Sequence, residues 1–260
     1  QYGGGFGEIP GIWVGKFETT GEYTEGDASK ISVKPGEASL RNMTVNEQYK
    51  AGMTATYGES ANLNSHMMKN SEWGATVYLA HSKYGTNKQK VEQNKNASFY
   101  TGGTNIVEEI YTTNKTQSTT HNANGLYDLN GGAWERVASY VNNGNGNLGT
   151  YGGKNAGDLY GATEKEQTTS TKYKTVYSSE NNELKDYETA GKKNKGDAMY
   201  ETTSSHSDGV GSWFEAGVEF PYGIYPRGGG NVVTNTGTFF SIAYHGENNS
   251  RDSFRLVLVP

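Results

Sequence analysis

Five histidines are the side chains in this chain best suited to metal or acid–base chemistry, and there is no cysteine. They are His66, His81, His121, His206 and His245. A helical metal site places two histidines four residues apart, and no pair here has that spacing. The lack of cysteine excludes disulfides, thiolate metal sites and thiol nucleophiles. A histidine-bound metal is therefore the least favoured interpretation of these residues.

Two other catalytic arrangements find equally little support. The chain has no Gly-x-Ser-x-Gly elbow of the kind that carries a hydrolase serine. The neighbouring carboxylates Glu108-Glu109 and Glu164/Glu166 lie in polar stretches. A glycosidase needs two carboxyl groups facing each other about 5–9 Å apart, and solvated surface is the better interpretation of these pairs. We therefore predict no catalytic residues.

Oxygen-rich loops leave calcium as an option, while no other cofactor is expected. Asp128, Asn130 and the loop 142–147 carry side chains that could donate oxygen to calcium. Asparagine in glycine-rich loops more often makes turns. Turn formation is therefore the favoured role of these residues.

The composition indicates one folded domain over residues 1–260, with an aromatic core and long polar loops. The chain has 19 Tyr, 8 Phe, 4 Trp and 36 Gly, and its net charge is -5. Aromatic side chains bury a large area each, and long loops cost little closure entropy. No basic stripe is present to neutralise phosphates, and no segment approaches the ~20 apolar residues of a membrane span. We expect neither a nucleic-acid partner nor a membrane span.

Two helices are predicted from caps and periodicity. Thr44-Val-Asn-Glu47 has capping-box spacing, and its helix should run to about Ala55. Asn70 or Ser71 should cap a second helix, and Gly85 should end it as a C-cap. Its buried face should carry four residues at helical spacing. These four are Trp73, Val77, Ala80 and Tyr84.

Short apolar runs predict strands at both ends of the chain. They cover residues 12–17, 223–227, 237–244 and 254–259. Residues 86–123 should be mostly loop, and 142–207 should form a polar surface insertion containing a short helix at 197–203. The fold class is therefore α+β, with two helices, short twisted antiparallel sheets and much loop.

Five phrases occur in the order found in one known fold. They are Trp13-Val-Gly-Lys-Phe-Glu18, Asn70-Ser-Glu-Trp73, Gly125-Leu-Tyr-Asp-Leu-Asn-Gly-Gly-Ala-Trp-Glu135, Arg227-Gly-Gly and Phe254-Arg255. This order resembles the formylglycine-generating-enzyme (sulfatase-modifying factor) type of the C-type-lectin fold. The family's oxidase uses a cysteine pair and copper, so the missing thiols imply a non-enzymatic branch.

The resemblance implies structural roles for several residues. Trp13, Trp73 and Trp134 should be buried, and Arg227 should belong to the scaffold. Arg255 lies among apolar residues and needs a carboxylate partner if it is buried. Glu135 is the first candidate for that partner, and Glu72 is the second.

One non-enzymatic subgroup of this fold is the variable proteins of diversity-generating retroelements in phages and bacteria. They display a ligand-binding face from residues near the C-terminus, and the segment Asn231 to Asp252 occupies the matching place. Tyr gives contact area at low entropy cost, and Ser and Asn adapt their hydrogen bonds. The candidate ligand-binding residues are Asn231, Asn235, Ser241, Tyr244, His245, Asn248, Asn249 and Ser250.

The predicted function is an extracellular binding module on a cell surface or virion, with a protein or glycan ligand. An ordinary polar hairpin is the alternative interpretation of the segment. Gln1-Tyr-Gly-Gly-Gly is not a natural start, which keeps open a structural surface subunit of a pilus or filament. A metal-dependent enzyme of the formylglycine-generating type comes third.

Overall fold

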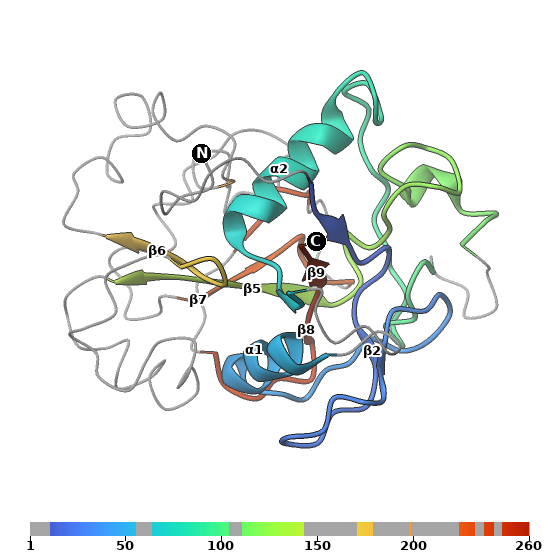
Figure 1. Cartoon of the computed structure of the whole chain (residues 1–260). Helices are drawn as coiled ribbons and strands as arrows, with labels where there is room; N and C mark the ends of the chain where they lie inside the picture. Colours follow the sequence, from blue (N-terminus) through green and yellow to red (C-terminus); the bar gives the residue numbers. More distant parts are fainter. Residues whose placement is uncertain are drawn as a thin grey trace.

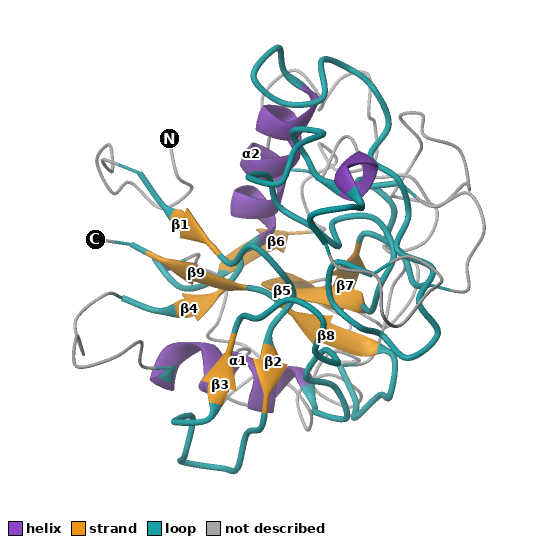
Figure 2. Ribbon diagram, turned by 90° about the vertical axis from the view of Figure 1, so that its right-hand side faces the viewer, coloured by secondary structure: helices purple, strands orange, loops and turns teal. Residues whose placement is uncertain are grey.

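The computed structural model describes residues 11–55, 64–103, 111–142, 171–178, 198, 224–231, 237–241 and 246–259. These residues form a mixed α and β structure with two α-helices and small sheets. The helices lie on opposite sides of the strands, α2 on one side and α1 on the other (Figures 1 and 2). The α+β class expected from the sequence is therefore present.

Helix α1 spans Val45–Thr54 and begins at the predicted capping box. The backbone N–H of Glu47 donates to the Thr44 hydroxyl, and the Thr44 N–H donates to the Glu47 carboxylate at 2.6 Å. Val45 and Tyr49 are buried. Both ends of this helix were predicted correctly.

Helix α2 spans Asn70–His81, and its ends differ from the prediction. The N-cap is Lys69, whose N–H donates to the Glu72 carboxylate at 2.9 Å. The helix stops three residues before Tyr84, which is 72% exposed and therefore not part of the buried face. The chain folds back at that point, because the Thr86 N–H donates to the Ala80 carbonyl at 2.6 Å.

A three-stranded antiparallel sheet joins the two ends of the described chain. Strand β9 (Leu256–Leu258) lies between β1 (Trp13–Val14) and β4 (His66–Met67). A separate antiparallel pair consists of β2 (Thr20–Gly21) and β3 (Ile31–Ser32). The predicted first and last strands thus pair with each other.

The central sheet is mixed, so the expectation of antiparallel sheets is wrong here. Strand β5 (Trp134–Asn142) pairs in parallel with β6 (Thr175–Ser178) and β8 (Asp252–Phe254). It pairs antiparallel with β7 (Ile224–Arg227). Strand β6 belongs to the segment expected to lie on the surface, yet it hydrogen-bonds to the central strand.

Loops make up most of the rest of the described chain. Between residues 86 and 123 the described part contains one short 3-10 helix, η1 (Lys115–Gln117), which fits the loop prediction. In the predicted strand 237–244, Ser241 forms a bridge with Arg227, and residues 242–245 lie outside the described part. The predicted helix 197–203 also lies outside it, except for Ala198. The described helices are too short to cross a bilayer.

Two of the three tryptophans that carry the family resemblance lie in the core. Trp73 is fully buried and packs with Val77 and Leu129, and Trp134 is 7% exposed. Trp13 is 70% exposed, so its predicted burial is wrong. Its backbone pairs with β9, but its side chain lies on the outer side of that two-residue strand.

Candidate functional site

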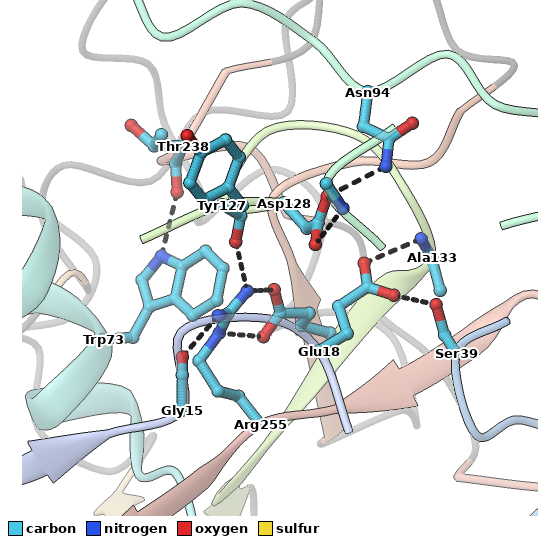
Figure 3. A network of polar contacts seen from close by, with 12 residues as sticks. Gly15, Glu18, Ser39, Trp73, Asn94, Tyr127, Asp128, Ala133, Thr238 and Arg255 are labelled. Atoms are coloured by element: carbon cyan, nitrogen blue, oxygen red, sulfur yellow. Dashed lines mark hydrogen bonds and ion pairs between the residues drawn. The ribbon is translucent and has the colours of Figure 1, made fainter. Parts of the chain in front are cut away.

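Arg255 lies in a buried polar network (Figure 3), and its partner is the predicted Glu135. The Arg255 Nε lies 2.9 Å from one carboxylate oxygen of Glu135, and Nη2 lies 2.5 Å from the other. Nη1 donates to the Gly15 carbonyl and Nη2 to the Tyr127 carbonyl. Through these hydrogen bonds, Arg255, which lies between β8 and β9, contacts the segment after β1, the chain before β5 and β5 itself.

Two further carboxyl groups lie in the same network. Asp128 accepts hydrogen bonds from the Asn94 amide at 2.8 Å and from the Gly102 N–H at 2.9 Å. Glu18 accepts a hydrogen bond from the Ala133 N–H at 2.9 Å. Both side chains are fully buried. Three interior carboxyl groups therefore accompany a single guanidinium.

Burial raises the pKa values of all three carboxyl groups. Burial raises the pKa of Glu18 well above its ordinary value, and the charges of Asp128 and Glu135 add to the effect. Burial raises the pKa of Asp128 to about 6, against the opposing effect of Arg255. The pKa of Glu135 is also raised by burial, although Arg255 favours its charged form.

Burial and the neighbouring carboxyl groups favour the neutral form of Glu18. The Ser39 hydroxyl contacts both a Glu18 carboxyl oxygen, to which it can donate, and the Phe99 carbonyl, the latter at 2.9 Å. A hydroxyl is both a donor and an acceptor, so the same contact accommodates a protonated Glu18 that donates to Ser39. Because the pKa of Glu18 is raised well above its ordinary value, we expect Glu18 to be the neutral acid of this network.

The Arg227-Gly-Gly phrase anchors the segment that follows β7. The Arg227 Nε donates to the Asn70 side chain at 2.7 Å, at the start of α2. Gly228 has a φ of +77° and lies so close to Trp73 that a Cβ would approach its ring at 3.3 Å. The Trp73 indole N–H donates to the Thr238 carbonyl at 2.8 Å. The phrase thus ties β7 to α2 around a buried indole.

The predicted ligand-binding residues divide into three groups. Asn231 and Ser241 are buried, and their side chains donate to the Asn96 and Pro226 carbonyls at 2.8 Å. These two side chains face the interior and hold loops together. Three others lie outside the described residues, namely Asn235, Tyr244 and His245.

The remaining three predicted residues form a continuous surface tip. Asn248 and Ser250 are exposed, and Asn249 is half-buried. The Asn248 amide donates to the Asn42 carbonyl at 2.8 Å, and the Asn42 N–H donates to the Asn249 carbonyl at 3.0 Å. Arg41 donates to the Ser250 carbonyl. Two backbone carbonyls and the Asn248 side chain therefore hold the tip to residues 41 and 42, while Asn248 and Ser250 stay exposed to the solvent.

A buried ion pair lies directly beneath this tip. The Arg136 Nη2 lies 2.7 Å from an Asp252 carboxylate oxygen and donates to the Glu247 carbonyl at 2.5 Å. Nη1 of the same arginine donates to the Met43 carbonyl at 3.0 Å. Both ends of the tip are thus attached to strand β5 through one guanidinium.

Among the described histidines, His66 and His81 have protein partners, as do the calcium candidates Asp128 and Asn130, and residues 143–147 lie outside the described part. His66 is buried, and its Nε2 lies 3.0 Å from the Glu72 carboxylate, so Glu72 contacts this ring and not Arg255. Asp128 is held by Asn94 and Gly102, and the Asn130 amide donates to the Val91 carbonyl at 2.7 Å. Within the described ranges no three His, Asp or Glu side chains gather as a metal site would require.

Sequence reasoning missed the role of Glu18. Its signal was present, since a glutamate directly after Phe17 at the end of an apolar strand is placed to enter the core. Sequence reasoning also missed Ser39 and Asn94, which come from loops 21 and 76 residues away from Glu18. Neither loop position has a pattern that points inward.

Neither the family models nor the curated proteins contain one that is similar to this chain.

Proposed function

We propose that this protein is a non-catalytic binding module on a C-type-lectin-like scaffold, exposed on a cell or virion surface. Its ligand face is the tip Asn248–Ser250, with Asn235, Tyr244 and His245 as further contacts. This is the arrangement of the variable proteins of diversity-generating retroelements. Asn231 and Ser241 are left out of the face, because their side chains are buried in loop contacts.

The observation that carries the proposal is the contrast between the tip and its base. Asn248 and Ser250 are exposed, whereas Arg136 and Asp252 beneath them are buried and paired at 2.7 Å. Binding residues are typically found on loops that a rigid scaffold positions. The backbone carbonyls of Asn249 and Ser250 accept from Asn42 and Arg41, and these two contacts do not depend on which side chains the tip carries.

The scaffold residues named by the resemblance also support the proposal. Glu135 and Arg255 form a buried pair, and Trp73 and Trp134 lie in the core. Among the described residues no three His, Asp or Glu side chains are placed to hold a metal ion. A rigid body with a polar exposed tip suits recognition better than chemistry.

The test uses labelled protein and intact cells from a panel of bacterial strains, measured by flow cytometry. Binding should be restricted to some strains, and the double variant Asn248→Ala/Ser250→Ala should lose it at least tenfold. A matched control is Asn122→Ala/Ser98→Ala, which removes an exposed asparagine bonded to one carbonyl and an exposed serine. Equal binding by both double variants would rule out the tip as the ligand face.

A further inference from the structure

A second surface feature lies between β1, the outer side of α2 and the loop 119–126. It is a groove of about 570 Å³. Helix α2 and strand β1 are neighbours in both ribbon views (Figures 1 and 2). The groove volume falls in the ~300–1,000 Å³ range of small-molecule sites.

The groove gathers most of the large apolar side chains that the described chain exposes. Trp13 is 70% exposed, Leu79 is 61% exposed and Tyr84 is 72% exposed, and all three line it. Clusters of exposed apolar side chains mark interaction sites on soluble proteins. The groove therefore has the character of a binding site rather than of ordinary surface.

The chemistry of the walls limits the ligand. The lining contains no Asp, Glu, Lys, Arg or His side chain. A charged ligand would lose water without gaining a partner. The polar groups are instead neutral, on Thr119, Thr120 and Asn124. Lys83 stays at the rim, with its Nζ 4.9 Å from the centre of the Tyr84 ring.

The walls are also held in place by the backbone. The Thr119 N–H donates to the Leu126 carbonyl, and the Leu126 N–H donates to the Thr119 hydroxyl, each at 2.9 Å. On the opposite side, the Thr86 N–H donates to the Ala80 carbonyl beside the groove. A preformed site loses little conformational entropy on binding.

We propose that this groove binds a neutral saccharide, with a sugar ring stacked on Trp13 or Tyr84. A pyranose presents C–H groups on its faces and hydroxyl groups around its edge. The faces match the aromatic rings, and the edge matches the Asn124 amide and the Thr120 hydroxyl. An apolar peptide would cover the rings but leave the exposed Asn124 amide without a ligand partner, which is unfavourable. This inference does not depend on the tip Asn248–Ser250.

Isothermal titration calorimetry with neutral hexasaccharides of glucose, mannose, xylose and N-acetylglucosamine tests the proposal. At least one should bind saturably to the full chain, while a hexagalacturonate should not. Trp13→Ala and Tyr84→Ala should each weaken the binding at least tenfold. Because both side chains are largely exposed, circular dichroism and the melting temperature should stay unchanged.

Tyr78→Ala is the matched control, since Tyr78 is a 43% exposed aromatic residue of α2 outside the groove lining. It should bind the sugar like the wild type. The proposal is overturned if none of the four sugars binds, or if Trp13→Ala binds as tightly as the wild type. Self-association of the wild type that Trp13→Ala abolishes in sedimentation velocity, without sugar binding, would make the groove a protein interface instead.

Discussion

At the scale of single residues, the carboxyl group of Glu18 decides how the interior balances its charges. Three buried carboxyl groups share one guanidinium, and Arg255 forks onto Glu135 alone. Burial raises the pKa of Glu18 well above its ordinary value, so we expect a neutral acid there, with Ser39 and Ala133 as its hydrogen-bond partners. Its neutrality removes one of the three negative charges from the interior.

Glu18→Gln should therefore be tolerated, and it should stabilise the protein at alkaline pH. The amide oxygen can accept from Ala133, and the amide nitrogen can donate to Ser39 as the protonated acid does. Glutamine cannot ionise in the unfolded chain, whereas the wild-type glutamate can. The free energy of unfolding of Glu18→Gln should therefore rise relative to that of the wild type by up to about 1.4 kcal/mol per pH unit above pH 5. Urea unfolding at pH 5 and pH 8 measures it. A variant equally destabilised at both values would show that Glu18 is charged.

Glu135→Gln should have the opposite effect, because Arg255 would lose its counter-ion. Removing one partner of a buried pair costs about 3–5 kcal/mol. In the same urea titration at pH 7, the free energy of unfolding of Glu135→Gln should therefore be well below that of Glu18→Gln. Equal stability of the two variants would contradict the assignment of charge to Glu135.

At the scale of elements, the helices were easier to predict than the strands. The capping box at Thr44 is a local signal, and α1 begins where it predicts. The end of α2 depends on the turn through Thr86, a contact that periodicity does not reveal. Strands β1 and β4 have only two residues each, and both pair with β9. Two residues are too few to show a strand pattern of their own, so the sequence does not reveal this pairing. The parallel pairing of β5 with β6 and β8 could not be inferred from alternation, which carries no direction.

Thr44→Ala tests the weight of the capping box. The change removes the acceptor of the Glu47 N–H, and it should lower the free energy of unfolding by about 1 kcal/mol. Thermal denaturation measures the loss. Thr54→Ala is a control at the other end of α1, where the exposed hydroxyl donates to the Lys50 carbonyl, and it should have a smaller effect.

At the scale of the whole molecule, the raised carboxyl pKa values should make stability fall as the pH rises. In the unfolded chain these groups ionise near a pKa of about 4. In the folded chain Asp128 ionises at about 6, and the pKa of Glu18 lies well above its ordinary value. Their contribution is complete below pH 4 and is lost as the pH passes through the folded pKa values.

The melting temperature should accordingly be higher near pH 5 than near pH 8. Differential scanning calorimetry across this range checks the sign. The Asp252 carboxyl acts in the same direction, because burial raises its pKa more than Arg136 lowers it. A melting temperature that rises steadily from pH 5 to pH 8 would contradict the buried-charge imbalance.

The positions of the scaffold residues could be predicted from the sequence better than those of the candidate ligand-binding residues. The Arg255–Glu135 pair was predictable because an arginine among apolar residues needs a carboxylate. Asn231 and Ser241 look like surface residues by type, yet loop carbonyls hold them inside. Trp13 looks like a core residue by type, yet it faces the solvent. Residue type and neighbours cannot reveal which side of a short strand or loop is covered.

The proposal that a variable polar tip lies on a constant buried base is tested most directly by sequencing. The 3′ end of the coding region would be sequenced deeply across many cells of one population. Substitutions should concentrate at Asn248, Asn249 and Ser250, while Asp252 and Arg255 stay constant. Substitutions spread evenly over the segment, or a segment without any, would contradict the claim.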